Sequence, residues 1–113
     1  RRLEQPEWRD PASGYRRRNV SPAGVAQPMR IVDVHFPPGA RVAFDNDAAE
    51  LRTYQQIWVL EGRLEMTVGA ERHRLQEGDC LAMELDRPVS FHNPTRRTTR
   101  YAVVVATEPR RRR

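Results

Sequence analysis

The chain has 113 residues, of which 38% are hydrophobic and 31% charged, and this size predicts a single small domain. No apolar run approaches the roughly 18 residues that a membrane-spanning helix requires, and no secretory signal pattern is recognisable. We therefore expect neither a membrane protein nor a secreted one. The only cysteine, Cys80, excludes an internal disulfide, favours a reducing cytoplasmic location, and is interpreted as a small buried hydrophobic residue. The first residue is Arg1, which leaves open that a partner domain is missing.

The net charge of +5 is concentrated at the two ends of the chain, and all twenty basic residues are arginine. Residues 1–28 carry a net +3, residues 29–107 a net −1, and residues 108–113 a net +3. The nearly neutral central part argues against a nucleic-acid-binding face there. Arg110–Arg113 could contact phosphate, but we interpret residues 108–113 as a solvated, arginine-rich tail.

Residues 1–28 are rich in proline and arginine, lack a sustained periodicity, and cannot form a long helix. Aromatic residues in such a polar segment usually pack on something, and this segment contains Trp8 and Tyr15. We interpret it as a linker whose second half, Tyr15–Val20, docks on the barrel or on a second subunit, with an extra strand as one form of docking.

The next segment, Met29–Phe36, is rich in β-branched residues and is bounded by prolines, which predicts a strand. Its two faces carry Val32, Val34 and Phe36 on one side and Ile31, Asp33 and His35 on the other. We favour a hydrogen-bonded core histidine at His35. A short strand is predicted at Arg41–Phe44, followed by a polar loop at Asp45–Glu50.

Three glycines mark the bends of a predicted β-meander over Gln55–Phe91, namely Gly62, Gly69 and Gly78. Between the first two bends, Leu64, Met66 and Val68 alternate with polar residues, as in a half-buried strand. A last strand is predicted at Arg100–Thr107. His73 and His92 are interpreted as surface or structural residues. No segment shows helical periodicity, so the sequence predicts an all-β sandwich or barrel.

Three stretches of this meander resemble the core of the cupin superfamily: Gln55–Gly62 (QQIWVLEG), Leu75–Asp79 (LQEGD) and Pro88–Asn93 (PVSFHN). Cupin motifs read G-x5-H-x-H-x3,4-E-x6-G and G-x5-P-x-G-x2-H-x3-N. Their framework positions match Gly39, Gly62, Gly78 and Asn93. The resemblance implies a cupin-type jelly-roll barrel, or double-stranded β-helix, over residues 29–107.

The metal-binding positions of the cupin motifs are not kept. The motif glutamate falls at Gln55, and the second-motif histidine falls at Val89. The two histidines of the first motif fall at Ala49 and Leu51, or at Ala48 and Glu50 with the longer spacing. Divalent metals need imidazole and carboxylate donors. We therefore expect no metal, no cofactor and no catalytic residue.

A closer likeness is to bacterial transcriptional regulators with an XRE-type helix-turn-helix followed by a cupin sensor. It rests on residues 8–22, on QQIWVLEGRLEMTVG from Gln55, and on residues 78–106. The likeness implies a domain that senses a small molecule and forms homodimers. It also implies that DNA binding belongs to a helix-turn-helix outside this chain, because none is recognisable in it.

We expect an effector to bind at the barrel mouth, with Gln55 and the Tyr101 hydroxyl setting its orientation. The candidate ligand-binding residues are Leu51, Gln55, Ile57, Met83, Val89, Phe91 and Tyr101. Three alternatives stay open. These side chains could fill the barrel completely, the domain could be a structural dimeriser without ligand, or it could be an isomerase or dioxygenase using Asp33, His35 or Glu50.

Overall fold

In the computed structural model of the protein, residues 7–22, 24, 27–46 and 51–109 are described, and they form ten β-strands and no helix. The strands are β1 (Glu7–Arg9), β2 (Arg16–Asn19), β3 (Met29–Phe36), β4 (Arg41–Phe44), β5 (Leu51–Glu61), β6 (Leu64–Val68), β7 (Glu71–Leu75), β8 (Cys80–Glu84), β9 (Val89–His92) and β10 (Thr99–Pro109). None of the described residues belongs to a helix long and apolar enough to cross a membrane.

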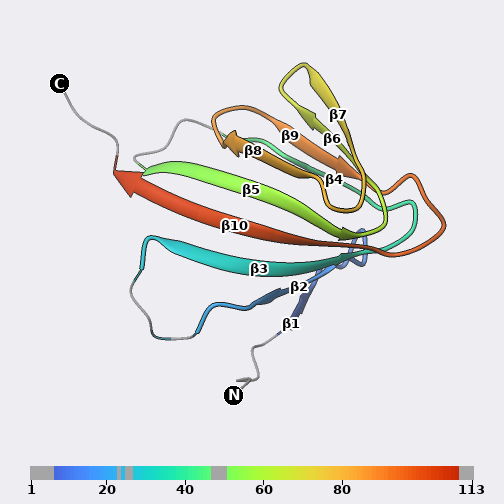
Figure 1. Cartoon of the computed structure of the whole chain (residues 1–113), viewed down its shortest axis with the longest axis horizontal. Coiled ribbons are helices and arrows are strands. Elements are labelled where there is room, and N and C mark those ends of the chain that lie inside the picture. Colours follow the sequence, from blue (N-terminus) through green and yellow to red (C-terminus); the bar gives the residue numbers. More distant parts are fainter. Residues whose placement is uncertain (1–6, 23, 25–26, 47–50, 110–113) are drawn as a thin grey trace.

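The strands form two sheets that enclose a single core (Figure 1). The larger sheet has the strand order β1-β2-β3-β10-β5-β8, and the smaller has the order β4-β9-β6-β7. The pairing within both sheets is antiparallel, as in β10 with β3 and β6 with β9. This arrangement confirms the predicted all-β jelly-roll barrel.

The side-chain alternation of the strands decides which residues reach the core. On β3, Val32, Val34 and Phe36 are buried, and on β6 Leu64 and Met66 are buried, as their spacing predicts. The core is therefore built from every second residue of strands that face each other across the barrel.

The prediction of a core histidine at His35 is wrong, because this residue lies on the opposite face of β3 from Val34 and Phe36. Its neighbour Asp33 lies on that same outer face but is only 6% exposed. The Arg100 guanidinium lies 3.1 Å from the Asp33 carboxylate, and the Arg18 guanidinium and His35 Nε2 each lie 3.5 Å from it. Asp33 is thus buried by its own ion partners.

The N-terminal segment adds two strands to the edge of the larger sheet. β2 pairs with β3, placing Arg17 beside Val34, and β1 pairs with β2, placing Trp8 beside Arg17. Tyr15, which precedes β2, is only 8% exposed and contacts Trp8 and Phe36 through its ring. The segment docks on the barrel of its own chain.

Asn93 ties the two sheets together at one end of the barrel and is completely buried. Its side-chain amide donates hydrogen bonds to the backbone carbonyls of Phe36 (3.0 Å), Pro37 (3.1 Å) and Arg97 (2.7 Å). Its side-chain oxygen accepts hydrogen bonds from the Thr95 amide (2.9 Å) and hydroxyl (2.7 Å). One side chain therefore connects the end of β3 with the loop between β9 and β10.

Replacing Asn93 by alanine should lower the free energy of unfolding by about 3 kcal/mol, because buried carbonyls lose their donor. Asn93→Asp should be at least as harmful, since a carboxylate cannot donate to a carbonyl. Asn46→Ala is the control, because the Asn46 amide donates one exposed hydrogen bond to the Arg87 carbonyl and should cost less than about 1 kcal/mol. Urea titration measures all three, and equal losses for the two alanine variants would contradict the assigned role.

The glycine bends give a second matched comparison. Gly62 and Gly78 both have positive φ, 87° and 92°, as predicted. A Cβ on Gly62 would lie 2.8 Å from the Thr99 Oγ1, which cannot move away freely because it donates a 2.6 Å hydrogen bond to the Arg63 carbonyl. A Cβ on Gly78 would meet nothing within 4 Å.

Gly78→Ala should therefore cost about 1 kcal/mol from backbone strain alone. Gly62→Ala should cost roughly 1–3 kcal/mol more, because it adds a collision to the same strain. Thermal and urea unfolding of the two variants measure the difference. A similar stability of both would show that the Thr99 contact relaxes without loss.

Candidate functional site

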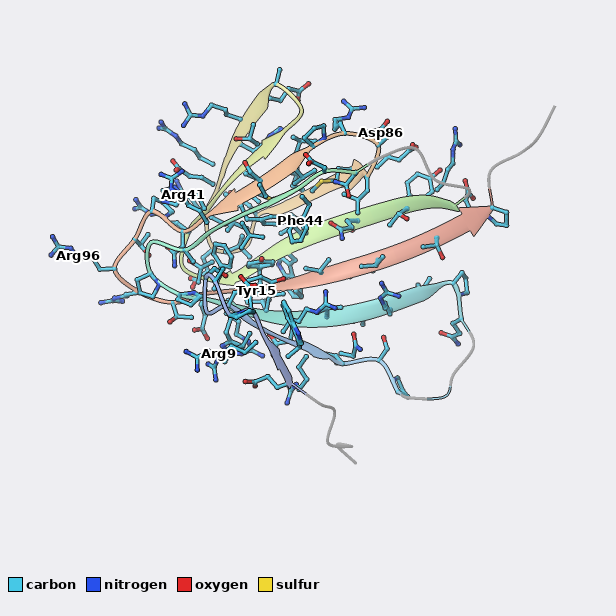
Figure 2. All side chains as sticks on the ribbon, turned by 180° about the vertical axis from the view of Figure 1, so that it is seen from behind. Arg9, Tyr15, Arg41, Phe44, Asp86 and Arg96 are labelled. Atoms are coloured by element: carbon cyan, nitrogen blue, oxygen red, sulfur yellow. The ribbon has the colours of Figure 1, made fainter. Side chains whose placement is uncertain are left out.

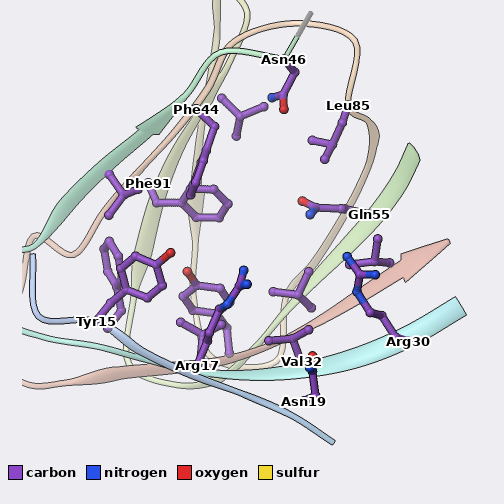
Figure 3. A pocket seen from close by; sticks show the side chains of 17 residues that line it. Tyr15, Arg17, Asn19, Arg30, Val32, Phe44, Asn46, Gln55, Leu85 and Phe91 are labelled. Carbon is purple, nitrogen blue, oxygen red and sulfur yellow. The ribbon is translucent and has the colours of Figure 1, made fainter. Parts of the chain in front are cut away.

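A cavity of about 420 Å³ opens between the two sheets (Figure 3). The larger sheet contributes residues from β2, β3, β10 and β5, and the smaller sheet contributes residues from β4 and β9. Phe44 and Tyr15 lie toward the middle of the molecule, whereas Arg96 extends away from it (Figure 2). The volume is suited to a small organic molecule.

The register of the larger sheet sets the order of side chains in the cavity. β3 and β10 pair so that Val32 lies beside Val103, and one step further along Arg30 lies beside Val105. On the other side of β10, Val105 lies beside Gln55 of β5. The cavity therefore has valines on its wall and a polar pair, Arg30 and Gln55, flanking Val105.

An aromatic wall faces the same space. The rings of Phe91 and Tyr101 are stacked, with centroids 5.8 Å apart and an interplanar angle of 7°. Phe44 meets Phe91 edge-on at 6.0 Å, and Phe36 meets Tyr101 edge-on at 6.1 Å. These contacts hold a flat apolar surface against which a ligand could pack.

Four of the predicted site residues line the cavity, and the structure brings them together: Gln55, Val89, Phe91 and Tyr101. Ile57 does not line it, because this residue is completely buried in the core. Met83 does not line it either, although it lies beside Gln55 on β8 and packs against the core. The side chain of Leu51 lies outside the described residues, as does Glu50. The alternative of a completely filled barrel does not agree with the structure.

Several polar residues line the cavity without being among the predicted site residues, namely Tyr15, Arg17, Asn19 and Arg30. The first three alternate along one face of the N-terminal segment, which was interpreted as a linker. Arg30 continues the inward alternation of Val32 and Val34 by one further step. The period-2 pattern contained this information, but a charged residue at the end of a strand usually points to solvent.

The cavity is rich in hydrogen-bond donors. Burial raises the pKa of Tyr101, and burial also raises the pKa of Tyr15, with the Arg17 charge acting in the opposite direction. Both hydroxyls are therefore protonated near neutral pH. Among the described residues, neither hydroxyl has a hydrogen-bond partner, and the side-chain amide of Gln55 has none either. Every fully buried side-chain polar atom in the described part of the chain does have a partner, so these three groups are not fully buried. These groups therefore remain available to a ligand.

The described residues that line the cavity do not fit a divalent-metal centre. Val89 offers no donor atom, and Gln55 offers one amide oxygen. The described part of the chain contains no group of three His, Cys, Asp or Glu side chains that could hold a metal ion.

The three histidines and Cys80, all in the described part of the chain, do not line the cavity. His92 contacts Glu65 at 3.0 Å beside a hollow of about 70 Å³ on the smaller sheet, and its hydrogen bond lowers the pKa of the Glu65 carboxyl. His73 lies 3.5 Å from Glu71. Cys80 is exposed at the start of β8, so its interpretation as a buried residue is wrong. The two histidine–glutamate pairs are surface ion pairs of small energetic effect.

Comparison with known proteins agrees with this geometry. The Cupin_2 family profile (Cupin domain) matches residues 32–105. No curated protein matches the chain. The cupin domain of an XRE family transcriptional regulator from Enterobacter cloacae has a similar structure, with 19% identity, a TM-score of 0.73, and coverage of 85% of this chain and 98% of that one.

Two further solved structures are similar. An HTH_3 family transcriptional regulator from Vibrio cholerae has 21% identity and a TM-score of 0.72, and the match covers 88% of this chain and 55% of that chain. KdgF from Halomonas sp. has 22% identity and a TM-score of 0.69, and the match covers 92% of this chain and 86% of that chain. At such identities the likeness establishes the fold alone. From the profile match and this fold, the chain belongs to the Cupin_2 family of cupin domains.

Proposed function

We propose that this chain is the effector-sensing and dimerisation domain of a cytoplasmic bacterial transcriptional regulator. In this proposal, DNA binding belongs to a helix-turn-helix outside the chain. The similar structures include the cupin domain of an XRE family transcriptional regulator and an HTH_3 family transcriptional regulator. A helix-turn-helix encoded before Arg1 is the expectation of this proposal.

The observation that supports sensing is the open cavity with partnerless polar groups. A ligand pocket combines apolar walls with a few polar groups that fix orientation. The cavity has valines and an aromatic wall, with the Gln55 amide and the Tyr101 hydroxyl free to bind. A structural dimeriser without ligand would have no need for such a space.

Catalysis is the less favoured function because of the chemistry of the lining. General acid–base catalysis usually employs His, Asp, Glu, Lys or Cys with a pKa near the working pH. Among its described residues, the lining contains none of these, and the raised pKa of Tyr101 makes this hydroxyl unsuitable as a base at neutral pH. We therefore favour binding over an isomerase or dioxygenase activity.

A thermal-shift screen against small metabolites tests the sensing proposal. A ligand at about 100 times its Kd should raise the Tm by roughly 10 °C, since it binds only the folded state. Val89→Trp should abolish this shift, because Val89 lines the cavity. Ser90→Trp is the matched control, because Ser90 lies on the opposite face of β9 and lines only the small outer hollow.

The folding of both tryptophan variants is checked by their Tm without ligand. A shift that survives in Val89→Trp, or a screen in which no compound stabilises the wild type, would argue against effector binding in this cavity.

The outer face of the larger sheet is our candidate for the dimer surface. Met29, Ile31 and Trp58 are 57%, 43% and 50% exposed there. The register places Ile31 beside Val104 of the neighbouring strand, and Trp58 beside Ala102. These residues, which we call the outer apolar face, form a continuous apolar surface of the kind that associates with another protein. We propose that a second copy of the chain covers it.

Trp58→Glu should therefore convert a dimer to a monomer or weaken its association at least tenfold, because a buried interfacial tryptophan typically contributes about 2 kcal/mol or more. Trp8→Glu is the control, since Trp8 is similarly exposed (47%) but belongs to β1 at the sheet edge. Light scattering after gel filtration measures both. A wild-type monomer, or equal effects of the two variants, would contradict this surface.

A further inference from the structure

The charged groups of the cavity are all of one sign. Its lining includes Arg17 and Arg30 and, among the described residues, no aspartate or glutamate. Neither guanidinium forms an ion pair with a described residue. The arginines that do pair with described carboxylates lie elsewhere: Arg16, Arg18, Arg52, Arg74, Arg87 and Arg100. The cavity therefore concentrates positive charge that the described protein groups do not neutralise.

We propose that the cavity binds a small organic acid, with its carboxylate held by Arg17 and Arg30 and its apolar body packed against the aromatic wall. The proposal deepens the sensing function and rests on it. Figure 3 shows Arg17 and Arg30 projecting from β2 and β3 toward the cavity, opposite Phe44 and near Gln55. A planar guanidinium matches the two oxygens of a carboxylate through paired hydrogen bonds.

Arg17 is oriented before any ligand arrives. Its guanidinium carbon lies 5.3 Å from the centroid of the Trp8 ring, as in a cation–π interaction, and Trp8 in turn contacts Tyr15 edge-on at 5.5 Å. A side chain held in this way loses less conformational entropy on binding than a free one. Trp8 and Tyr15 therefore act as positioning residues for the proposed anion contact.

The neutral polar groups favour the same ligand. A carboxylate offers about four acceptor positions and no donor. The cavity supplies protonated hydroxyls on Tyr15 and Tyr101, whose pKa values are raised by burial. The Gln55 amide, which lies near Arg30 (Figure 3), adds a further donor. A neutral amide ligand would bring its own donors and would leave the positive charge of both guanidinium groups uncompensated.

The apolar wall decides between an organic acid and a free inorganic anion. Inorganic phosphate could contact the guanidinium groups but would leave Phe44, which lines the cavity and is 42% exposed, in contact with water. An acid with an aromatic or aliphatic body removes this surface from water, which contributes roughly 25 cal/mol per Å². We therefore expect organic acids to bind more tightly than phosphate.

NMR titration of the whole chain tests the proposal, with phenylacetate, phenylacetamide, hexanoate, hexanamide and inorganic phosphate as probes. The two acids should shift the Nε–H signals of Arg17 and Arg30 and the backbone amides of Val103 and Val105. The matched amides and phosphate should bind at least about tenfold more weakly. The amides lose the charge-assisted hydrogen bonds, and phosphate loses the burial of an apolar body. Added salt should weaken the binding of the acids.

Arg30→Gln and Arg17→Gln should each raise the Kd of phenylacetate roughly tenfold or more, since each removes one charge and leaves a shorter, neutral polar side chain. Arg96→Gln is the matched control, because Arg96 extends from a loop away from the cavity (Figure 2) and should leave the Kd unchanged. If loss of the Trp8 contact alters the fold of Arg17→Gln, the exposed Arg30→Gln still decides the result.

The possible results separate the two proposals. Acid binding that needs Arg30 and not Arg96 supports the inference. Phenylacetamide binding as tightly as phenylacetate in the same cavity would overturn the anion assignment while leaving small-molecule sensing intact. Phosphate binding as tightly as the acids would overturn the role of the aromatic wall. If no probe shifts the signals of Val103 and Val105, the organic-acid inference fails, whereas the sensing function is decided separately by the thermal-shift screen.

Discussion

The hydrogen bonds of Asn93 are the constraint on which the site depends. β9 belongs to the smaller sheet and carries Val89 and Phe91, whereas β3 and β10 belong to the larger sheet. The backbone amide of Asn93 also donates to the Ala40 carbonyl, and its own carbonyl accepts from the Gly39 amide, both at 3.0 Å. The end of β9 is thereby fixed to the chain on both sides, and the stacking of Phe91 on Tyr101 follows from that position. A barrel that closed loosely here would lose the flat wall of the cavity.

The barrel could be predicted from the sequence because strand alternation and glycine turns depend on residues that are close together in the chain. The alternation of Leu64, Met66 and Val68 and the positive φ of Gly62 and Gly78 depend on neighbouring residues only, and the structure confirms them. The burial of Asp33 and the exposure of Cys80 depend on partners distant in sequence. Arg100, which covers Asp33, comes from a different strand, so no pattern within Met29–Phe36 could reveal it.

The site was predicted only in part, for a related reason. The cupin motifs located Gln55 and Val89, and the strand neighbours Phe91 and Tyr101 followed from them. Motif positions say nothing about residues that reach the cavity from strands outside the motifs. Arg17 reaches the cavity because β2 pairs with β3, a long-range pairing that composition did not indicate. Ile57 was misplaced because an inward-facing residue can lie in the packed core beneath a cavity instead of on its wall.

If the chain has the sensing function proposed above, the composition of the site offers a way to couple binding to other parts of the protein. A ligand shifts a conformational equilibrium only if it binds one state better than the other. β1 and β2 are largely exposed strands at the edge of the larger sheet, so their docking is held by fewer buried contacts than that of the strands in the core. If an anion binds Arg17 and Arg30 together, it connects β2 with β3 and stabilises the docked state of the N-terminal segment. The guanidinium group of Arg17 would then both bind the ligand and stabilise the docking of the N-terminal segment, without any change in the barrel itself.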